Sequence, residues 1–538
     1  SNLAGSKTSS GSQISRIMGA VGAEKMEIAR PYLKIRHQIK QTGEIYFPVS
    51  DADDAEAVQK YNESLDSWEQ RQGYGITVED GHACINSYER DTLMILRKLI
   101  EMSSQGNDGQ KEYNRNFLKQ NPLNNVDELK KKAIESAFVN SRMLLIYGAA
   151  GTGKTTLLNI VSNLMKDRRK LFLTKTHTAL QNLKHRIDNP GPNADFTSFD
   201  SFTHKVNLPD YDVIFVDECS TIDNLKMTKF FERIGPNTFV VMAGDIHQIE
   251  SIDFGNWFFY AKNIITTLGA NVELLSTWRT QDQDLKSLWD EVRNKGPYIT
   301  EKLVIDGPFS ENIGQNVLKS SSSDEVILCL NYDGKFGLNN MNHYFQAANP
   351  NLKAATWVDW TYKVGDPILF NDSKRFPLLY NNLKGRIVDI EKEPDVITFT
   401  VDVQCFLTDA DCRRNDIVYI KSHDTGTRIQ FTVVAYDGEQ ADGEDDAQRM
   451  RSIIPFQLAY AVSIHKAQGL EYDSVKVIIP SNNAEKITHG VFYTAITRAK
   501  KHLKIYWSSE TMKDIVQGFT AAELEGRSLE IVKSKLGI

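Results

Sequence analysis

The chain has 538 residues, more than one ordinary hydrophobic core organises, so we expect three or four structural units. Its net charge of −7 is unlike that of a protein that coats DNA electrostatically, so any nucleic-acid contact must come from a local track. Five scattered cysteines without CxxC spacing argue against a disulfide framework or a zinc site and indicate a reducing cytoplasm. The longest apolar runs are far too short to span a membrane, and no cleavable signal segment opens the chain.

Residues 14–120 carry no chemical motif. Helical patterns lie around Ser15–Gln38, Ala55–Arg71 and Asn86–Ser104, with an extended stretch at Tyr74–Cys84. We expect a mainly helical accessory domain that packs on the rest of the chain or binds a protein partner. The preceding residues 1–13 are rich in Ser and Gly, which predicts a flexible tail.

A phosphate-binding pattern organises the rest of the chain. Gly148–Thr155 has the spacing G-x-x-x-x-G-K-[ST] of a P-loop, with the apolar strand-like run Met143–Tyr147 before it and helical spacing after it. Backbone N–H groups of such a loop point at phosphate, Lys154 reaches the β- and γ-phosphates, and the Thr155 hydroxyl holds Mg²⁺. The expected nucleotide-binding residues of this stretch are Gly148, Ala149, Gly151, Thr152, Gly153, Lys154, Thr155 and Thr156.

From residue 121 to residue 305 the pattern alternates between strands and helices, which predicts a parallel sheet covered on both faces. The predicted strand Lys170–Thr174 is followed by Thr176 and His177, at the edge where parallel sheets bind ligands. These two side chains either contact a ligand or form a polar turn capped by threonine.

The apolar strand that begins at Val213 ends in two adjacent carboxylates, Asp217 and Glu218. At a strand end the chain turns, so both carboxylates can approach one phosphate. Asp217 suits the coordination of Mg²⁺, and Glu218 suits activation of the water that attacks the γ-phosphate. We interpret this segment as the Walker B strand that accompanies the P-loop.

Two later strand ends also carry polar groups. The strand Phe239–Ala243 leads to Gln248, which can hydrogen-bond a γ-phosphate or water without adding charge. Phe254 and Trp257 follow, and such aromatic residues either stack on bases or pack in the core. Arg279 lies just past another strand, a position that by itself is typical of a surface residue.

The second half of the chain contains a change of pattern. Residues 306–323 are typical of a linker, and strand–helix alternation returns at 324–355 and 446–538. Between these two segments, residues 356–445 contain short strands separated by Gly, Asn and Asp turns, which predicts a small inserted antiparallel barrel. The acidic segment Gly438–Ala447 is expected to form a solvated loop.

The motif order closely resembles that of superfamily 1 helicases, over about residues 143–507. The blocks are GAAGTGKT, TKTHTAL, VDECS, AGDIHQ, STWRT, SIHKAQGLEYDSV and FYTAITRAK. The HKAQG block and the inserted barrel are most similar to the RecD-type branch, whose members move 5′ to 3′ on single-stranded DNA. The resemblance implies an ATP- and Mg²⁺-dependent DNA helicase with two RecA-like lobes, the second lobe carrying an SH3-like barrel.

The resemblance also implies roles for individual residues. Phosphates and Mg²⁺ would be bound by Lys154 and Thr155, and the metal and the attacking water would be held by Asp217 and Glu218. The γ-phosphate would be contacted by Gln248 and Arg279. Gly469 and Glu471 would line the nucleotide from the second lobe, and Arg498 resembles an arginine finger. The residues that resemble a nucleic-acid track are Thr176, His177, His465 and Lys466.

Two departures from the family pattern keep alternatives open. Relatives place a Gln about twenty residues before the P-loop to recognise adenine, whereas Leu123–Glu128 contains none, so strict ATP preference is not implied. The connection from Arg186 to Phe196 is short for a strand-separating hairpin, so translocation is better supported than unwinding. The alternatives are a non-unwinding ATPase subunit of a nuclease, defence or repair complex, an RNA helicase, and an ATP-gated binding switch.

Overall fold

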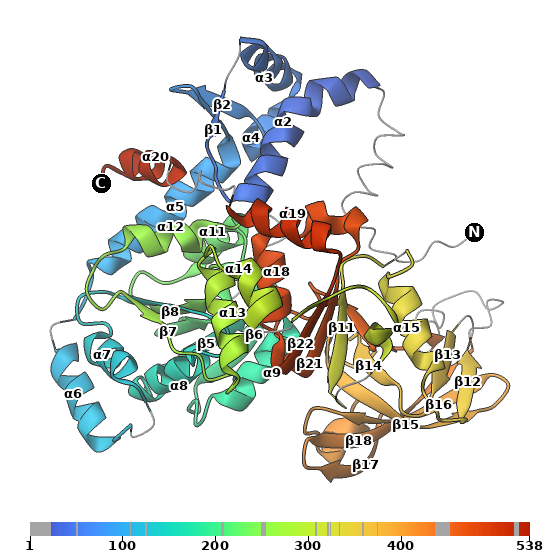
Figure 1. Cartoon of the computed structure of the whole chain (residues 1–538). Coiled ribbons are helices and arrows are strands. Elements are labelled where there is room, and N and C mark those ends of the chain that lie inside the picture. The colour runs from blue at the N-terminus through green and yellow to red at the C-terminus, as the bar shows by residue number, and fades with distance from the viewer. Residues whose placement is uncertain are drawn as a thin grey trace.

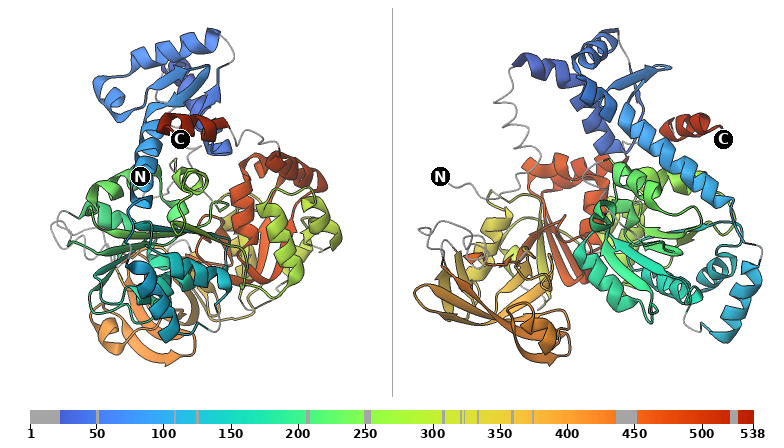
Figure 2. Two further views of the ribbon diagram at one scale, coloured as in Figure 1. Left: turned by 90° about the vertical axis from the view of Figure 1, so that its left-hand side faces the viewer. Right: turned by 180° about the vertical axis from the view of Figure 1, so that it is seen from behind.

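The computed structural model describes residues 23–49, 52–107, 109–123, 126–205, 209–248, 254–306, 309–319, 322, 324–332, 334–357, 360–373, 375–435, 452–520 and 527–538. The expected tail at residues 1–13 and the acidic segment Gly438–Ala447 lie outside these residues. Figures 1 and 2 show an N-terminal region above a first α/β lobe, with a second lobe and an antiparallel sheet beside it. Within the described ranges, no helix combines the length and the hydropathy of a membrane span.

The first lobe is built on a six-stranded parallel sheet with the order β6-β5-β7-β8-β4-β9. The strands are almost continuous apolar runs because helices cover both faces of the sheet. The strands are β4 (Met143–Gly148), β5 (Lys170–Thr174), β6 (Ala194–Ser198), β7 (Val213–Val216), β8 (Phe239–Gly244) and β9 (Asn271–Leu274). One face packs on α7 (Glu128–Ser136), α8 (Lys154–Leu164) and α9 (His177–Arg186), and the other packs on α5 (Asn86–Ser103), α10 (Phe199–His204), α11 (Asn224–Arg233) and α12 (Trp257–Ile264).

The N-terminal region shares its core with the first lobe. Its helices surround a small sheet with the order β1-β3-β2, and α5 leads from that sheet along the first lobe (Figure 1). Apolar residues at helical spacing on α5, among them Leu96 and Leu99, are fully buried. The described part of residues 14–120 therefore packs on the first lobe, which is one of the two arrangements expected for it. The elements are α2 (Ala23–Thr42), β1 (Phe47–Pro48), α3 (Ala52–Ser64), α4 (Ser67–Gln72), β2 (Ile76–Glu79), β3 (His82–Ile85) and α6 (Gln110–Gln120), the last of which packs on α7.

The second lobe is built on a five-stranded parallel sheet with the order β10-β22-β21-β11-β20. Its strands are β10 (Ser310–Glu311), β11 (Glu325–Cys329), β20 (Ala461–Ser463), β21 (Tyr472–Ile478) and β22 (Ala499–Tyr506). Its helices are α13 (Gln283–Arg293), α14 (Ile299–Glu301), α15 (Leu338–Ala347), α18 (His489–Ile496) and α19 (Ser509–Thr520). The expectation of an α/β fold with parallel sheets is confirmed by the two lobes.

Two expected boundaries of the second lobe are wrong. Residues after Gln283 were expected in the first lobe, but α13 buries Leu285, Leu288 and Trp289 in the core of the second lobe. The Trp289 indole N–H also donates to the Ile496 carbonyl oxygen over 3.2 Å. The expected linker 306–323 contains β10, which pairs with β22 and so belongs to the second sheet.

The insertion forms an antiparallel sheet with the order β17-β18-β16-β15-β14-β19 around its own core. In this order β17 and β19 are the outer strands, so the SH3-like barrel stays a prediction. The strands are β14 (Pro367–Phe370), β15 (Lys384–Lys392), β16 (Val396–Val403), β17 (Val418–His423), β18 (Gly426–Val434) and β19 (Phe456–Leu458), accompanied by α16 (Asp409–Arg413) and the hairpin β12 (Ala354–Trp357) and β13 (Trp360–Lys363).

The last helix, α20 (Arg527–Leu536), packs beside α5 rather than on the second sheet (Figure 1). Val532 is fully buried in the core that α5 shares with the first lobe. Lys535 pairs with Glu79 over 2.6 Å and with Glu89 over 2.7 Å, which ties the helix to the N-terminal sheet. The expected assignment of all residues 446–538 to the second lobe is therefore wrong for α20, and also for β19, which pairs with β14 in the inserted sheet.

Candidate active site

The P-loop connects the end of β4 to the start of α8. Gly151 and Gly153 adopt φ values of 77° and 87°, in the left-handed region that favours glycine. A Cβ on Gly151 would lie 2.4 Å from the Arg279 Cβ, so the close approach of these two segments also requires glycine. Lys154 Nζ donates to the carbonyl oxygens of Gly148 and Ala149 over 2.8 and 2.9 Å.

The segment after β9 holds the P-loop in place. The Trp278 amide donates to the Gly151 carbonyl oxygen over 2.8 Å, and the Thr277 hydroxyl donates to the Ala150 carbonyl oxygen over 3.1 Å. These bonds position Arg279 directly beside the phosphate-binding loop. Burial lowers the pKa of Lys154, and the charges of Asp245 and Asp217 oppose this shift.

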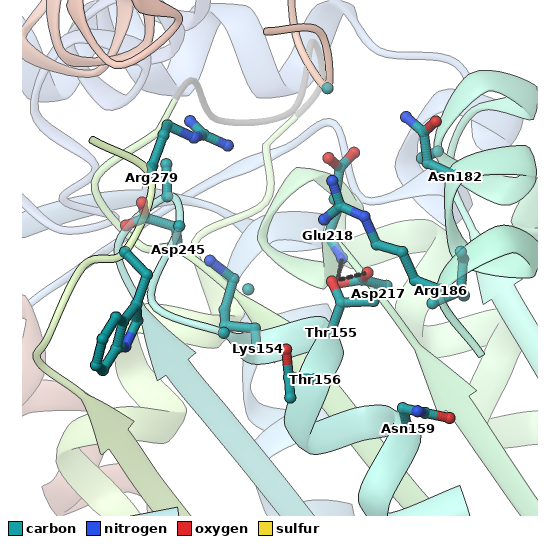
Figure 3. Close-up of a pocket in the computed structure, with 18 of the residues that line it drawn as sticks. Lys154, Thr155, Thr156, Asn159, Asn182, Arg186, Asp217, Glu218, Asp245 and Arg279 are labelled. Atoms are coloured by element: carbon teal, nitrogen blue, oxygen red, sulfur yellow. Dashed lines mark hydrogen bonds between the residues drawn. The ribbon is translucent and has the colours of Figure 1, made fainter. Parts of the chain in front are cut away.

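The two carboxylates expected at the end of β7 lie opposite the P-loop (Figure 3). The Thr155 hydroxyl donates to Asp217 Oδ2 over 3.3 Å, and the Glu218 amide donates to Asp217 Oδ1 over 2.9 Å. Burial, followed by the charge of Asp217, raises the pKa of Glu218. Glu218 also adopts the left-handed conformation, with φ 54° and ψ 34°, which costs a non-glycine residue about 1–3 kcal/mol and is typical of functional sites.

Arginines from both lobes meet at this site. Arg279 of the first lobe donates to the Thr497 carbonyl oxygen over 2.7 Å and to Glu471 Oε1 over 2.5 Å, both in the second lobe. Arg498 of the second lobe donates to the carbonyl oxygens of Thr494 and Leu470 over 3.0 and 3.2 Å. Burial lowers the pKa of Arg498 to about 10; the nearby charge of Arg279 also lowers it, and Glu218 opposes the shift.

A cavity of about 1220 Å³ lies between the lobes and brings most of the predicted residues together. Gly469 is placed opposite Glu218, since its added Cβ would lie 3.5 Å from Glu218 Oε1. Gln248 donates to Asp245 Oδ2 over 3.3 Å at the same cavity. The predicted residues that line it are Gly151, Gly153, Lys154, Thr155, Thr156, Asp217, Glu218, Gln248, Arg279, Gly469, Glu471 and Arg498.

Comparison with known proteins gives matches over both lobes. Residues 126–303 match a family model described as an AAA domain, and residues 458–506 match one described as the UvrD-like helicase C-terminal domain. The RecBCD enzyme subunit RecD of Mycolicibacterium smegmatis is 23% identical over 400 residues, covering 69% of this chain and 63% of that protein. The same subunit of Haemophilus influenzae is 22% identical over 460 residues, covering 72% and 70%.

The chain is related to the RecD-like helicases of superfamily 1. The ATP-dependent RecD2 DNA helicase of Deinococcus radiodurans is a further relative, 20% identical over 384 residues, covering 67% of this chain and 46% of that protein. The chain thus spans less than two thirds of the M. smegmatis and D. radiodurans proteins. Among solved structures, the Pif1 helicase from Candida albicans matches with 14% identity and a TM-score of 0.42, over 72% of this chain and 97% of that chain.

The aromatic residues expected near the nucleic-acid track of a RecD-like protein are not available for stacking on bases. Trp257 is fully buried, and its indole N–H donates to the Ile222 carbonyl oxygen over 3.0 Å. Phe254 is 6% exposed and stacks on Tyr88 at a centroid distance of 4.6 Å. The prediction that these two residues bind nucleic acid is therefore wrong, because both belong to the core under α5.

This correction gives a stability prediction. Trp257→Ala should destabilise the chain by roughly 3–5 kcal/mol, because it creates a cavity and removes the indole hydrogen bond. Its unfolding midpoint in urea should fall clearly below that of the parent chain. Exposed Trp278→Ala is the control and should leave the midpoint unchanged. An unchanged midpoint for Trp257→Ala would contradict the burial described above.

The other predicted nucleic-acid residues lie at strand ends of both lobes. Thr176 and His177 are exposed after β5, and the Thr176 hydroxyl caps α9 by accepting from the Ala179 amide over 3.2 Å. Lys466 Nζ donates to Gln457 Oε1 over 2.7 Å. Burial and then the positive charge of Lys175 lower the pKa of His465. Their contact with nucleic acid stays a prediction.

Sequence reasoning missed several residues of the cavity. Arg186, at the last position of α9, points towards Glu218 (Figure 3). Trp278 is 64% exposed and lines the cavity beside the P-loop. Asp127 and Lys130, at the start of α7, line it as well. The position of Trp278 next to Arg279 was the available signal, whereas Arg186, Asp127 and Lys130 resemble ordinary charged helix residues.

Proposed function

We propose that the chain is an ATP-dependent DNA helicase or translocase that moves 5′ to 3′ on single-stranded DNA. The observation that carries this proposal is the single cavity lined by Lys154 and Glu218 of the first lobe and Arg498 of the second. A triphosphate held there contacts both lobes at once, so its hydrolysis alters the contact between them. The name of the RecD2 relative, a DNA helicase, supports DNA over RNA.

Each residue has a defined task in hydrolysis. The P-loop amides, Lys154, Arg279 and Arg498 bind the phosphate charge, and Arg498 stabilises the charge that develops in the transition state. Glu218, whose pKa burial raises, accepts a proton from the attacking water, which Gln248 orients. Thr155 and Asp217 present adjacent hydroxyl and carboxylate oxygens, a donor set that suits Mg²⁺ held largely by nucleotide phosphates. When bound, Mg²⁺ neutralises phosphate charge.

Arg279 links this chemistry to movement. It bonds Glu471 and the Thr497 carbonyl oxygen of the second lobe while standing beside the P-loop. A γ-phosphate competes with Glu471 for the same guanidinium, so the interlobe contact depends on the nucleotide bound. The nucleic-acid strand is then held differently before and after hydrolysis. It is contacted by exposed Thr176 and His177 on one lobe and by His465 and Lys466 on the other.

Other features fit this assignment. The inserted sheet, with its own core, is proposed to act as the SH3-like barrel of RecD-like proteins. The N-terminal region is proposed to bind a protein partner. The five free, buried cysteines support a reducing, cytoplasmic location.

A nucleotide-affinity prediction follows from Trp278. Its exposed indole at the mouth of the cavity should stack on the nucleobase. Trp278→Ala should therefore raise the KM for ATP about tenfold and leave kcat nearly unchanged, since base stacking is worth roughly 1–3 kcal/mol. Leu275→Ala, which removes an exposed side chain of the same segment outside the cavity, is the control in steady-state assays. Equal KM values in the two variants would contradict the stacking role.

The direct test compares ATP hydrolysis with single-stranded DNA, single-stranded RNA and duplex DNA. We expect single-stranded DNA to stimulate hydrolysis most, and displacement of streptavidin from the 3′ end of a biotinylated strand to be faster than from the 5′ end. Stimulation by RNA alone would assign the chain to RNA, and hydrolysis that no nucleic acid stimulates would overturn the proposal.

One observation favours a motor that does not unwind duplexes as the second candidate. α9 ends at Arg186 and β6 begins at Ala194, so residues 187–193 connect them without an inserted hairpin. A forked-duplex assay run beside streptavidin displacement separates the two functions. Displacement of streptavidin without strand separation would assign the chain to translocation alone.

A further inference from the structure

The start of α7 contributes a charged pair to the lining of the cavity. α7 lies beside the start of α8, and Lys130 Nζ would lie 3.3 Å from a Cβ on Gly153. Lys130 is 4% exposed and its ammonium bonds Asp127 Oδ2 over 2.5 Å. Both residues line the cavity. The start of α7 is therefore part of the same cavity wall that holds Lys154, Glu218 and Arg498.

The pair has hydrogen-bonding capacity left. Asp127 Oδ1 accepts from the Lys130 amide over 2.9 Å, which caps α7, and Oδ2 accepts from Lys130 Nζ. A carboxylate offers about four acceptor sites and an ammonium three donors, so each group retains about two. Burial opposes the shift, but the hydrogen bonds with Lys130 lower the pKa of Asp127, so the carboxylate stays charged and accepts only.

This pattern matches guanine as well as adenine. Guanine presents adjacent N1–H and N2–H donors to a carboxylate and its O6 acceptor to an ammonium. Adenine presents one donor, N6–H, and one ring-nitrogen acceptor. A side-chain amide, with one acceptor and one donor group, would satisfy adenine but not the two adjacent donors of guanine.

We infer that Asp127 and Lys130 recognise the edge of the nucleobase and admit guanine together with adenine, so that GTP drives the chain as well as ATP does. This inference rests on the proposed function, because it specifies the substrate of the same site. Asp127 is then a specificity-determining residue that contacts the base, whereas the phosphate chemistry is common to both nucleotides.

The test measures binding and turnover with ATP and GTP separately. Equilibrium competition of each nucleotide against a fluorescent N-methylanthraniloyl nucleotide gives affinity without hydrolysis, and steady-state assays with single-stranded DNA give kcat/KM. We expect the affinity for GTP and the kcat/KM with GTP each to lie within about threefold of the value for ATP, since Asp127 and Lys130 together satisfy both bases. Asp127→Asn should lower the affinity for GTP about tenfold or more and the affinity for ATP less than about threefold, because one carboxylate acceptor is lost.

The variants separate recognition from folding. Asparagine is as good a helix cap as aspartate, but it gives up the ion pair with buried Lys130, so the unfolding midpoint of Asp127→Asn should fall. Its nearly unchanged affinity for ATP is therefore the check that the cavity is still folded. Glu128→Gln is the matched control, because Glu128 is exposed, pairs with Lys131 and lies outside the cavity. Lys130→Met, which removes the donor to O6 and keeps a side chain of similar length, should also lower GTP affinity. Glu128→Gln should leave the GTP-to-ATP ratio unchanged.

The outcomes distinguish this inference from the proposed function. ATP preferred over GTP by more than about thirtyfold, or an unchanged GTP-to-ATP ratio in Asp127→Asn, would overturn the inference and leave the helicase assignment intact. If neither nucleotide is hydrolysed in the presence of single-stranded DNA while both bind, the proposed function fails and the base recognition stands.

Discussion

Glu218→Gln should lower kcat for ATP hydrolysis by roughly 10²–10⁴-fold, the usual contribution of a general base. The substitution removes the proton acceptor at the end of β7 but preserves the size of the side chain and its left-handed backbone. Nucleotide affinity should be retained or strengthened, because one buried negative charge beside the phosphates is lost. Single-turnover hydrolysis and equilibrium nucleotide binding measure the two effects separately.

Glu232→Gln is the control, since Glu232 is an exposed carboxylate on α11, away from the cavity. Its rate should equal that of the parent chain. A Glu218→Gln variant that hydrolyses ATP within about threefold of the parent rate would remove Glu218 from the chemistry, because a lost general base costs far more.

Arg498→Ala should lower kcat by about 10³–10⁵-fold, the range expected for an arginine finger. Arg498 is buried in the second lobe and faces Glu218 across the cavity, so it can stabilise transition-state charge that the first lobe alone cannot reach. The loss should appear in kcat, with a smaller change in the affinity for ATP. Steady-state hydrolysis assays with saturating ATP and single-stranded DNA give kcat.

A buried arginine also supports the fold, and this effect needs its own control. Arg293 is 7% exposed and bonds Glu273 Oε1 over 3.0 Å without lining the cavity. Arg293→Ala should lower the unfolding midpoint by a comparable amount while retaining most of kcat. If the two variants lose equal fractions of kcat, the loss in Arg498→Ala is structural, and the arginine-finger role is wrong.

The phosphate end of the site was predictable because its signals are local. Lys154, Thr155, Asp217 and Glu218 are fixed by short motifs at strand ends, and a parallel sheet brings strand ends to one edge. The meeting of Arg498 with Glu218 was predictable only through the resemblance, since no local pattern specifies how two lobes face each other.

Other features depend on tertiary packing that the sequence pattern does not express. Trp257 and Phe254 have the composition of a stacking platform, but α5, more than a hundred residues earlier, covers them. The apolar spacing on α13 predicts a buried face, formed by Leu285, Leu288 and Trp289. It does not indicate which of the two lobes buries that face. Asp127 and Lys130 have the spacing of a common exposed helix pair, and their role follows from the nearness of α7 to Gly153.

The return of α20 to the N-terminal sheet changes how the second lobe is attached. The chain leaves the first lobe before α13 and comes back after α19, so the second lobe is an insertion with two covalent crossings. Two covalent connections restrict the relative movement of the lobes more than a single linker would.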